Sequence, residues 1–280
     1  MGTNVLEVEI FSYCNRKCHW CPNSTIDRSV YTELDRNVYT KLLMDLKDTI
    51  DTISFSRYNE PMSHLDILID RISIARRIMP DTKLVLNTNG DFLTTLDIDI
   101  DELTIMDYDC NGIEHWIKKL SCLGAMITLL SHSQIRAEYE SMFILVELNW
   151  SNRENIIEDR GGLLRHDKML NWKNNAAIRS RPCYEPISFI GVDYSGNVVP
   201  CCHIRSDAKT HSDYILGNLY DTDINTILNS KKRSSFILDC IVGHFTGPCL
   251  TCQKDPGRYT NENGGIYGDK AESLHALAVG

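Results

Sequence analysis

The sequence of 280 residues predicts an α/β protein with a parallel sheet, followed by a small cysteine-rich C-terminal domain. The first observation behind this fold class is that strand-like and helix-like stretches alternate through residues 1–150. A repeated strand-then-helix order is typical of parallel sheets, because their crossover connections are helical. The second observation is a change in composition after Trp150, with six of the eleven cysteines at or beyond Cys183.

Six strand candidates lie before residue 150, and each is a short apolar run bounded by turn residues. In chain order they are Val5–Phe11, Asp51–Ser56, Lys83–Asn87, Leu103–Met106, Ala125–Leu130 and Met142–Leu148. Apolar residues at helical spacing mark three helix candidates between the strands. These helices are Asp35–Leu46, Leu65–Ile78 and Ile113–Leu123. Gly124 follows the third helix as its C-terminal cap. Six strands in this order predict an open barrel.

The C-terminal part begins with a hairpin signal. Two strand candidates, Ile187–Asp193 and Asn197–Pro200, flank the turn sequence Tyr194-Ser195-Gly196. A helix candidate follows at Thr222–Phe236, and the stretch from Asp255 is rich in Gly, Asn and Asp, as surface tails are. We therefore expect three units, at residues 1–175, 176–255 and 256–280.

Composition narrows the classes of function. The net charge is −9 and no block is rich in Lys or Arg, which argues against a nucleic-acid partner. No window approaches 18 apolar residues and no signal peptide is present, so we expect a cytoplasmic protein with no membrane partner. Cysteines in C-x2-C units without a secretion signal indicate metal binding rather than disulfides.

Three cysteines form a C-x3-C-x2-C run directly after the first strand candidate: Cys14, Cys18 and Cys21. Thiolate ligands in one short loop favour zinc or an iron–sulfur cluster. A structural zinc site uses four closed ligands, whereas three ligands on a four-iron cluster leave one iron open to an outside molecule. A zinc knuckle remains the alternative for this triplet.

Two further motifs stand at the ends of the next two strand candidates. Asn59, Glu60 and Pro61 follow the second strand, and Asn87, Thr88 and Asn89 end the third before Gly90. Each motif alone is typical of an ordinary turn. In parallel barrels, however, the chemistry sits at the C-terminal ends of the strands. Three motifs at successive strand ends therefore favour one shared binding site.

A second group of thiols belongs to the C-terminal part. Four thiolates from a hairpin and a C-x2-C unit can close around another cluster, with a zinc ribbon as the alternative: Cys183, Cys201, Cys249 and Cys252. Cys202 competes with Cys201 as a ligand, and we favour Cys201 because it follows the strand directly. Cys240 is an extra thiol that we interpret as a buried small hydrophobe, with an alternative ligand or a radical-quenching thiol as the other options.

The motifs together resemble those of the radical S-adenosylmethionine (SAM) enzymes, and the C-terminal cysteines resemble their twitch domain, a shortened SPASM extension. The resemblance implies a partial (β/α)6 TIM-like barrel with a twitch-like hairpin and helix domain, two [4Fe-4S] clusters and bound SAM. It further implies that Trp20 packs by the adenine. The family's Gly-Gly-Glu-Pro segment meets the SAM amino group, and here Tyr58 and Asn59 replace the two glycines before Glu60 and Pro61. Its Thr-Asn-Gly segment touches the ribose or carboxylate, which corresponds to Asn87–Asn89 here.

A resemblance to radical SAM dehydrogenases of aminocyclitols includes Arg160–Leu164. It implies that Arg160 lies near the substrate and binds it or helps to remove a proton; a loop ion pair is the alternative. The implied reaction is reductive cleavage of SAM and hydrogen abstraction from a polar small molecule, with net oxidation of an alcohol to a ketone. A flavodoxin- or ferredoxin-type protein is the implied electron donor. The alternatives are a maturase that crosslinks or epimerises a short peptide, and a two-cluster electron-transfer protein.

Overall fold

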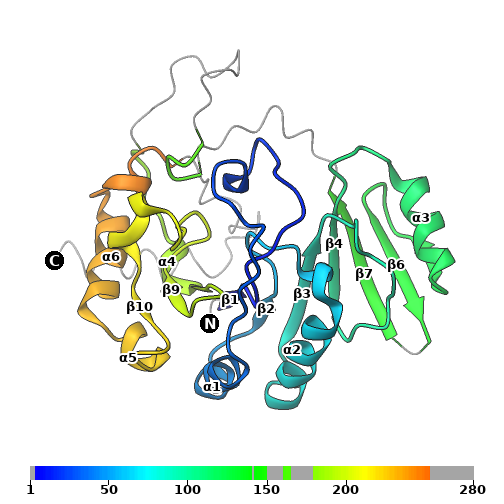
Figure 1. The fold of residues 1–280 in the computed structure, drawn as a ribbon, viewed down its shortest axis with the longest axis horizontal. Helices are drawn as coiled ribbons and strands as arrows, with labels where there is room; N and C mark the ends of the chain where they lie inside the picture. Colours follow the sequence, from blue (N-terminus) through cyan, green and yellow to red (C-terminus); the bar gives the residue numbers. More distant parts are fainter. Residues whose placement is uncertain (1–3, 141, 150–159, 165–178, 253–280) are drawn as a thin grey trace, which may run out of the picture.

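The computed structural model describes residues 4–140, 142–149, 160–164 and 179–252. Their strands are β1 Val5–Val8, β2 Thr52–Ser54, β3 Lys83–Thr88, β4 Glu102–Met106, β5 Met126–Leu129, β6 Gln134–Tyr139, β7 Met142–Asn149, β8 Phe189–Val192, β9 Asn197–Val199 and β10 Gly217–Asn218. In the described residues these strands form one ten-stranded sheet, in the order β10-β9-β8-β1-β2-β3-β4-β7-β6-β5 (Figure 1). The predicted α/β class is confirmed.

Six neighbouring strands are parallel, from β8 through β1, β2, β3 and β4 to β7. One of these six parallel strands is not the one that the sequence predicts. The predicted parallel strand Ala125–Leu130 is β5, which pairs antiparallel with the unpredicted β6. The turn at residues 130–133 is too short for a parallel crossover, which needs a dozen residues or more. Instead β8 pairs with the free side of β1, with Val5 opposite Phe189.

The helices are α1 Arg36–Leu46, α2 Leu65–Ile78, α3 Ile113–Cys122, α4 Glu185–Ser188, α5 Ile224–Leu228 and α6 Lys231–Val242. Helix α1 begins at Asp35, whose carboxylate accepts hydrogen bonds from the backbone N–H groups of Asn37 and Val38. Its buried residues, Tyr39, Leu42, Leu43 and Leu46, share one face and pack into the core. Helices α1 and α2 lie side by side, away from the dark-blue loop that follows β1 (Figure 1).

The predicted single helix at Thr222–Phe236 is wrong, because two helices occupy this region. Helix α5 ends at Leu228, and α6 begins after Ser230, whose hydroxyl accepts a hydrogen bond from the backbone N–H of Arg233. Ser230 is a favourable N-cap residue, so it starts a new helix rather than continuing the old one. Asp223 caps the first helix, where its carboxylate accepts a hydrogen bond from the backbone N–H of Thr226.

The predicted hairpin is present, with β8 antiparallel to β9 around the turn at residues 194–196. Strand β8 joins the same sheet as β1. The expected boundary at 175/176 and the tail at 256–280 lie outside the described residues, so the division into domains stays a prediction. Across the part of the chain that the structure describes, none of the helices combines the length and apolar character that crossing a membrane requires.

Candidate functional site

The cysteine triplet lies in the loop between β1 and a short 3-10 helix, Pro22–Ser24. All three thiols are free and partly exposed. The backbone N–H of Cys21 donates to the carbonyl of Cys18 at 2.9 Å, which curls the loop. Burial raises the pKa of the Cys14 thiol and raises that of Cys18 to about 11. A metal ion bound at these sulfurs would offset this effect, because it stabilises the thiolate form.

Polar tethers hold this loop across the ends of β3 and β4. The Arg16 guanidinium donates to Asp91, which follows β3, at 2.6 Å and to Asp109, which follows β4, at 2.7 Å. The Asn15 amide also donates to Asp91, at 2.7 Å. Sequence reasoning missed this role of Asp91, although it directly follows the Asn89-Gly90 pair. These tethers set where the cysteines stand relative to the other motifs.

Glu60 joins the second motif to the third. Its carboxylate accepts a hydrogen bond from the Thr88 hydroxyl at 2.6 Å and from the backbone N–H of Asn89 at 2.8 Å. The side chain is 2% exposed, and burial raises its pKa despite these two bonds. This carboxylate therefore ties the ends of β2 and β3 together. Its predicted contact with a cofactor amino group stays a prediction.

The third motif contacts the cysteine loop directly, since the Asn89 amide donates to the Asn15 side-chain oxygen at 2.9 Å. Asn87 exchanges two backbone hydrogen bonds with the Ser56 hydroxyl, at 2.7 and 2.8 Å. Gly90 has φ +77°, and a side chain there would lie 2.3 Å from the Trp116 ring. Only glycine fits this turn.

Asn59 and Pro61 shape the turn after β2. The Asn59 side-chain oxygen accepts from the backbone N–H of Arg57 at 3.1 Å, and Pro61 begins a 3-10 helix, Pro61–His64. The turn itself is anchored by the backbone N–H of Glu60, which donates to the Tyr13 carbonyl beside Cys14 at 2.9 Å. The structure therefore brings the three predicted motifs together.

Trp20 lies at the rim of this site, with its ring centroid 5.4 Å from that of Tyr108. Its indole Nε1 is buried and has no hydrogen-bond partner among the described residues. Buried donors are nearly always satisfied, so an orphaned one marks a place where a polar ligand fits. The predicted contact of Trp20 with an adenine remains untested, and the geometry is compatible with it.

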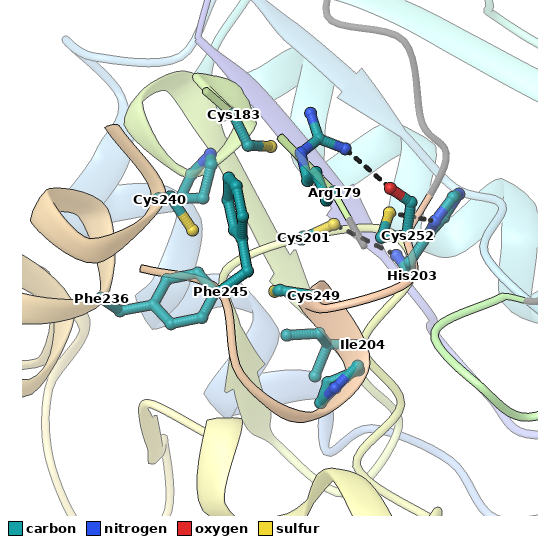
Figure 2. Close-up of a pocket in the computed structure, with 12 residues that line it drawn as sticks. Arg179, Cys183, Cys201, His203, Ile204, Phe236, Cys240, Phe245, Cys249 and Cys252 are labelled. Carbon is teal, nitrogen blue, oxygen red and sulfur yellow. Dashed lines mark hydrogen bonds between the residues drawn. The ribbon is translucent and has the colours of Figure 1, made fainter. Parts of the chain in front are cut away.

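The second site is a cavity that encloses about 400 Å³ of empty space, part of it open to solvent. Five sulfur-bearing residues line it (Figure 2): Cys183, Cys201, Cys240, Cys249 and Cys252. Apolar residues Phe236, Phe245 and Pro248 complete the wall. Cys202 is not among the lining residues, which supports our choice of Cys201 as the ligand.

Cys240 is buried as predicted, but it also faces the cavity. Its thiol hydrogen-bonds Cys249 and lowers the pKa of that thiol. Its carbonyl accepts from the backbone N–H of Cys183 at 2.9 Å. Interpreting Cys240 only as a small hydrophobe is therefore incomplete, because it is a fifth thiol in a cavity where four were expected.

Arg179 is a cavity residue that sequence reasoning missed. Its guanidinium donates to the carbonyls of Arg181, Pro182 and Cys252 at 2.9–3.2 Å, which ties the two ends of the cysteine-rich region together. Burial raises the pKa of Cys183 to about 11, and the charge of Arg179 opposes that rise. No spacing pattern marks this arginine in the sequence.

Arg160 contacts the wall of the second cavity. Its Nη1 lies 3.4 Å from Nε2 of His203, a residue of the cavity wall. Arg160 has φ +50°, which is an uncommon conformation for a residue with a side chain. The structure thus places this predicted substrate residue beside the second thiol set.

The donor sets fit a polynuclear cluster better than a zinc ion. In the described ranges, no three His, Cys, Asp or Glu side chains converge closely enough to hold a single metal ion. Tetrahedral zinc would require its sulfurs to meet at one point, with bonds of about 2.3 Å. The five cysteines instead surround a cavity, as ligands of a larger inorganic core do.

The two sites are linked by residues 202–207, which we call the bridging segment. The Tyr58 hydroxyl donates to the Cys202 carbonyl at 2.8 Å, and the Arg57 guanidinium donates to the Ile204 carbonyl at 2.8 Å. Tyr58 stands where related motifs have glycine. Its contact gives a reason for the departure, because the larger side chain reaches the bridging segment.

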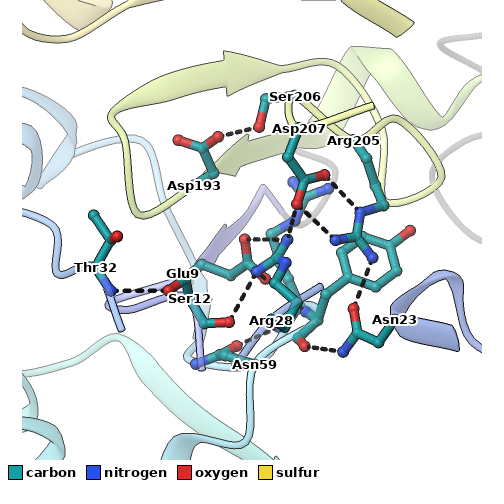
Figure 3. Close-up of polar contacts among 12 residues, drawn as sticks. Glu9, Ser12, Asn23, Arg28, Thr32, Asn59, Asp193, Arg205, Ser206 and Asp207 are labelled. Atoms are coloured by element: carbon teal, nitrogen blue, oxygen red, sulfur yellow. Dashed lines mark hydrogen bonds and ion pairs between the residues drawn. The ribbon is translucent and has the colours of Figure 1, made fainter. Parts of the chain in front are cut away.

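Buried charges complete this link (Figure 3). Arg205 lies 4.2 Å from the Tyr58 ring centroid and donates to the Asn23 side chain, two residues after Cys21, at 2.8 Å. Arg28 pairs with Glu9 at the end of β1 and with Asp207, both at 2.9 Å. All of these residues except Asp207 are buried, so the two sites share one largely buried network of polar contacts.

Comparison with known proteins assigns the second site. Residues 183–253 match SPASM, an iron–sulfur cluster-binding domain. We call this matched stretch the SPASM domain for its similarity to that family. The bridging segment and all five cavity cysteines belong to it.

Most of the chain also resembles known proteins over its length. It is 27% identical over 238 residues to the S-adenosyl-L-methionine-dependent 2-deoxy-scyllo-inosamine dehydrogenase of Niallia circulans, covering 83% of this chain and 85% of that protein. The crystal structure of BtrN in complex with AdoMet and 2-DOIA matches with a TM-score of 0.65 and 23% identity, over 91% of this chain and 95% of that one. An open conformation of BtrN matches with a TM-score of 0.57 and 21% identity, over 91% and 94%. The resemblance inferred from the sequence is confirmed.

Proposed function

We propose that the protein is a radical SAM enzyme that oxidises a secondary alcohol of a polar small molecule to a ketone. The observation that carries this proposal is that Arg160, the candidate substrate residue, contacts His203 in the wall of a SPASM cavity that buried contacts join to the cysteine triplet. The name of the curated relative, a dehydrogenase of an aminocyclitol, supports the same reaction class.

The candidate cluster ligands divide into two sets of cysteines. Cys14, Cys18 and Cys21 would hold a [4Fe-4S] cluster with one open iron, with SAM held by Trp20 and by the motifs after β2 and β3. The SPASM thiols Cys183, Cys201, Cys249 and Cys252 would hold a second [4Fe-4S] cluster. When bound and reduced, the first cluster and SAM together supply a 5′-deoxyadenosyl radical that removes a hydrogen atom from carbon.

The chain's own residues supply orientation and charge. Oxidation of an alcohol to a ketone removes a hydrogen atom, a proton and an electron. Arg160 has only donors, so it binds the substrate oxygen and favours the form that has lost its proton. His203 links Arg160 to Cys252, so a second cluster held by the SPASM thiols would be available to accept the remaining electron.

Anaerobic reconstitution tests this proposal. We expect about eight irons per chain, as two four-iron clusters. Incubation with dithionite, SAM and 2-deoxy-scyllo-inosamine, or with related aminocyclitols, should yield 5′-deoxyadenosine and a ketone lighter by two hydrogens. Two or fewer irons together with zinc would contradict the proposal. Clusters without SAM cleavage would favour the electron-transfer alternative, and cleavage accelerated only by a peptide would favour the maturase.

The partners follow from the same chemistry. We propose that a flavodoxin- or ferredoxin-type protein reduces the first cluster, and that no nucleic acid or membrane takes part. A reducing cytoplasm would keep the thiols ready to bind iron. Replacing dithionite by a reduced flavodoxin system should sustain SAM cleavage, and failure of both flavodoxin and ferredoxin would contradict this partner class.

A further inference from the structure

His203 lies at the centre of contacts that the proposed function does not yet use. It is 5% exposed and belongs to the bridging segment. Its backbone N–H donates to the Cys201 sulfur at 3.3 Å, and its ring Nδ1 lies 3.4 Å from the Cys252 sulfur. Its other ring nitrogen, Nε2, lies 3.4 Å from Arg160 Nη1. One residue therefore contacts two candidate cluster ligands and the candidate substrate arginine.

The chemistry of the partners fixes the direction of these hydrogen bonds. A guanidinium has no acceptor, so Arg160 donates and His203 Nε2 must accept. An accepting Nε2 places the ring proton on Nδ1. That proton faces the Cys252 sulfur, which accepts it. The contacts thus form one directional chain, from Arg160 through the imidazole to Cys252.

The Arg160 turn is built to meet this histidine. Gly161 has φ +68°, and a side chain there would lie 3.0 Å from Pro248 and 3.3 Å from the His203 carbonyl. A second buried histidine, His211, accepts from the backbone N–H of Arg205 at 3.0 Å, so its Nε2 donates to the Gly161 carbonyl at 2.8 Å. The SPASM domain therefore holds Arg160 and its neighbour from two sides.

We propose that His203 is a positioning residue that couples Arg160 to the second cluster, an inference that rests on the proposed function. Its two N–H groups donate to the sulfurs of Cys201 and Cys252, and its Nε2 holds the arginine at the cavity wall. Hydrogen bonds to cluster sulfurs raise the reduction potential, because they stabilise the more negative reduced state. His203 thus sets the potential of the second cluster and orients the substrate anchor at once.

A matched pair of variants separates the two roles. The amide nitrogen of asparagine takes the place of Nδ1, so His203→Asn keeps the hydrogen bond to Cys252 and loses the hydrogen bond from Arg160. The amide of glutamine takes the place of Nε2, so His203→Gln keeps Arg160 and loses the bond to Cys252. We expect His203→Gln to shift the midpoint potential of the second cluster to more negative values, measured by redox titration with EPR. We expect His203→Asn to stay near wild type.

Iron content distinguishes a change in the potential of the second cluster from loss of that cluster. About eight irons with an unmoved potential in His203→Gln would overturn this inference and leave the proposed function intact. A wild-type protein without clusters would overturn the proposed function itself. Loss of the second cluster in His203→Gln alone would support the inference, whereas its loss in His203→Asn would contradict it.

The link to Arg160 is tested by a double-mutant cycle that needs no substrate. Arg160→Met removes both a charge and the group that orients the imidazole. The potential shift that it causes should be smaller in a His203→Leu background than in wild type, because the imidazole transmits part of it. Equal shifts in the two backgrounds would show that Arg160 acts through space alone, and would overturn the coupling.

Discussion

The two thiol sites of this protein are built in opposite ways. The first takes its three cysteines from one loop after β1 and leaves them partly exposed, with polar tethers from β3 and β4 around them. The second gathers thiols from segments as distant as Cys183 and Cys252 and encloses them with phenylalanine and proline side chains. A local site keeps room for an outside ligand, whereas a site closed by tertiary packing excludes one.

The largest expected effect is at the open site. Cys14→Ala removes one of only three ligands in the loop, so it should reduce SAM cleavage to the background level and lower the iron content to about four per chain. Iron analysis and chromatographic detection of 5′-deoxyadenosine measure both. Retained cleavage would show that the triplet is not the SAM site, and Cys110→Ala, an exposed thiol outside both sites, serves as the control.

Substitutions of two different thiols in the second site should have different effects on the second cluster. Cys249→Ala should remove the second cluster, about four irons, while SAM cleavage continues at the first. Cys240→Ala should keep about eight irons, because four ligands remain. Mössbauer or EPR spectra distinguish the two clusters. An iron loss in Cys240→Ala equal to that in Cys249→Ala would make Cys240 a ligand and revise the set of four.

The contacts between the two sites can be removed without substituting a cysteine. Arg205→Met removes the contacts to Asn23 and Asp207 and leaves buried partners uncompensated, so the free energy of unfolding should fall by about 3 kcal/mol. Anaerobic urea denaturation followed by fluorescence measures it. Arg36→Met is the matched control, since it breaks the exposed pair with Asp70 and should cost less than about 1 kcal/mol. Equal losses of unfolding free energy in the two variants would show that the buried contacts of Arg205 stabilise the protein no more than an exposed ion pair does.

The smallest expected effect comes from one hydroxyl. Tyr58→Phe deletes the donor to the Cys202 carbonyl and keeps the ring beneath Arg205, so stability should fall by about 1 kcal/mol. Iron content should not change. Urea denaturation resolves this loss, and a loss of clusters would show that Tyr58 acts on a cysteine rather than on the link.

The difference between the sites also explains what the sequence could predict. The cysteine triplet, Glu60 and the Asn-Gly turn are short local patterns at strand ends, and the structure brings them together. The antiparallel direction of β5 was missed because its partner β6, which follows directly after the turn at residues 130–133, was not recognised as a strand.

The second site shows the limit more sharply. Spacing indicated four of the five cavity cysteines as ligands, but it could not show that Cys240 faces them. Arg179, His203 and Arg205 carry no motif, since their roles arise from contacts between segments far apart in the chain. Buried polar side chains with carbonyl and side-chain partners become visible only in three dimensions.

The pairing of β8 with β1 has a consequence for how the molecule is made. Strand β1 is synthesised first, but its second neighbour arrives only after nearly two hundred residues, when Phe189 takes its place opposite Val5. Contacts of such long range form late, because closing the intervening loop costs entropy. Until then the edge of β1 is open and the loop after it lacks the bridging segment. The cysteines that are translated earliest thus obtain their complete surroundings last, so a nascent or truncated chain would leave these thiols exposed for longest.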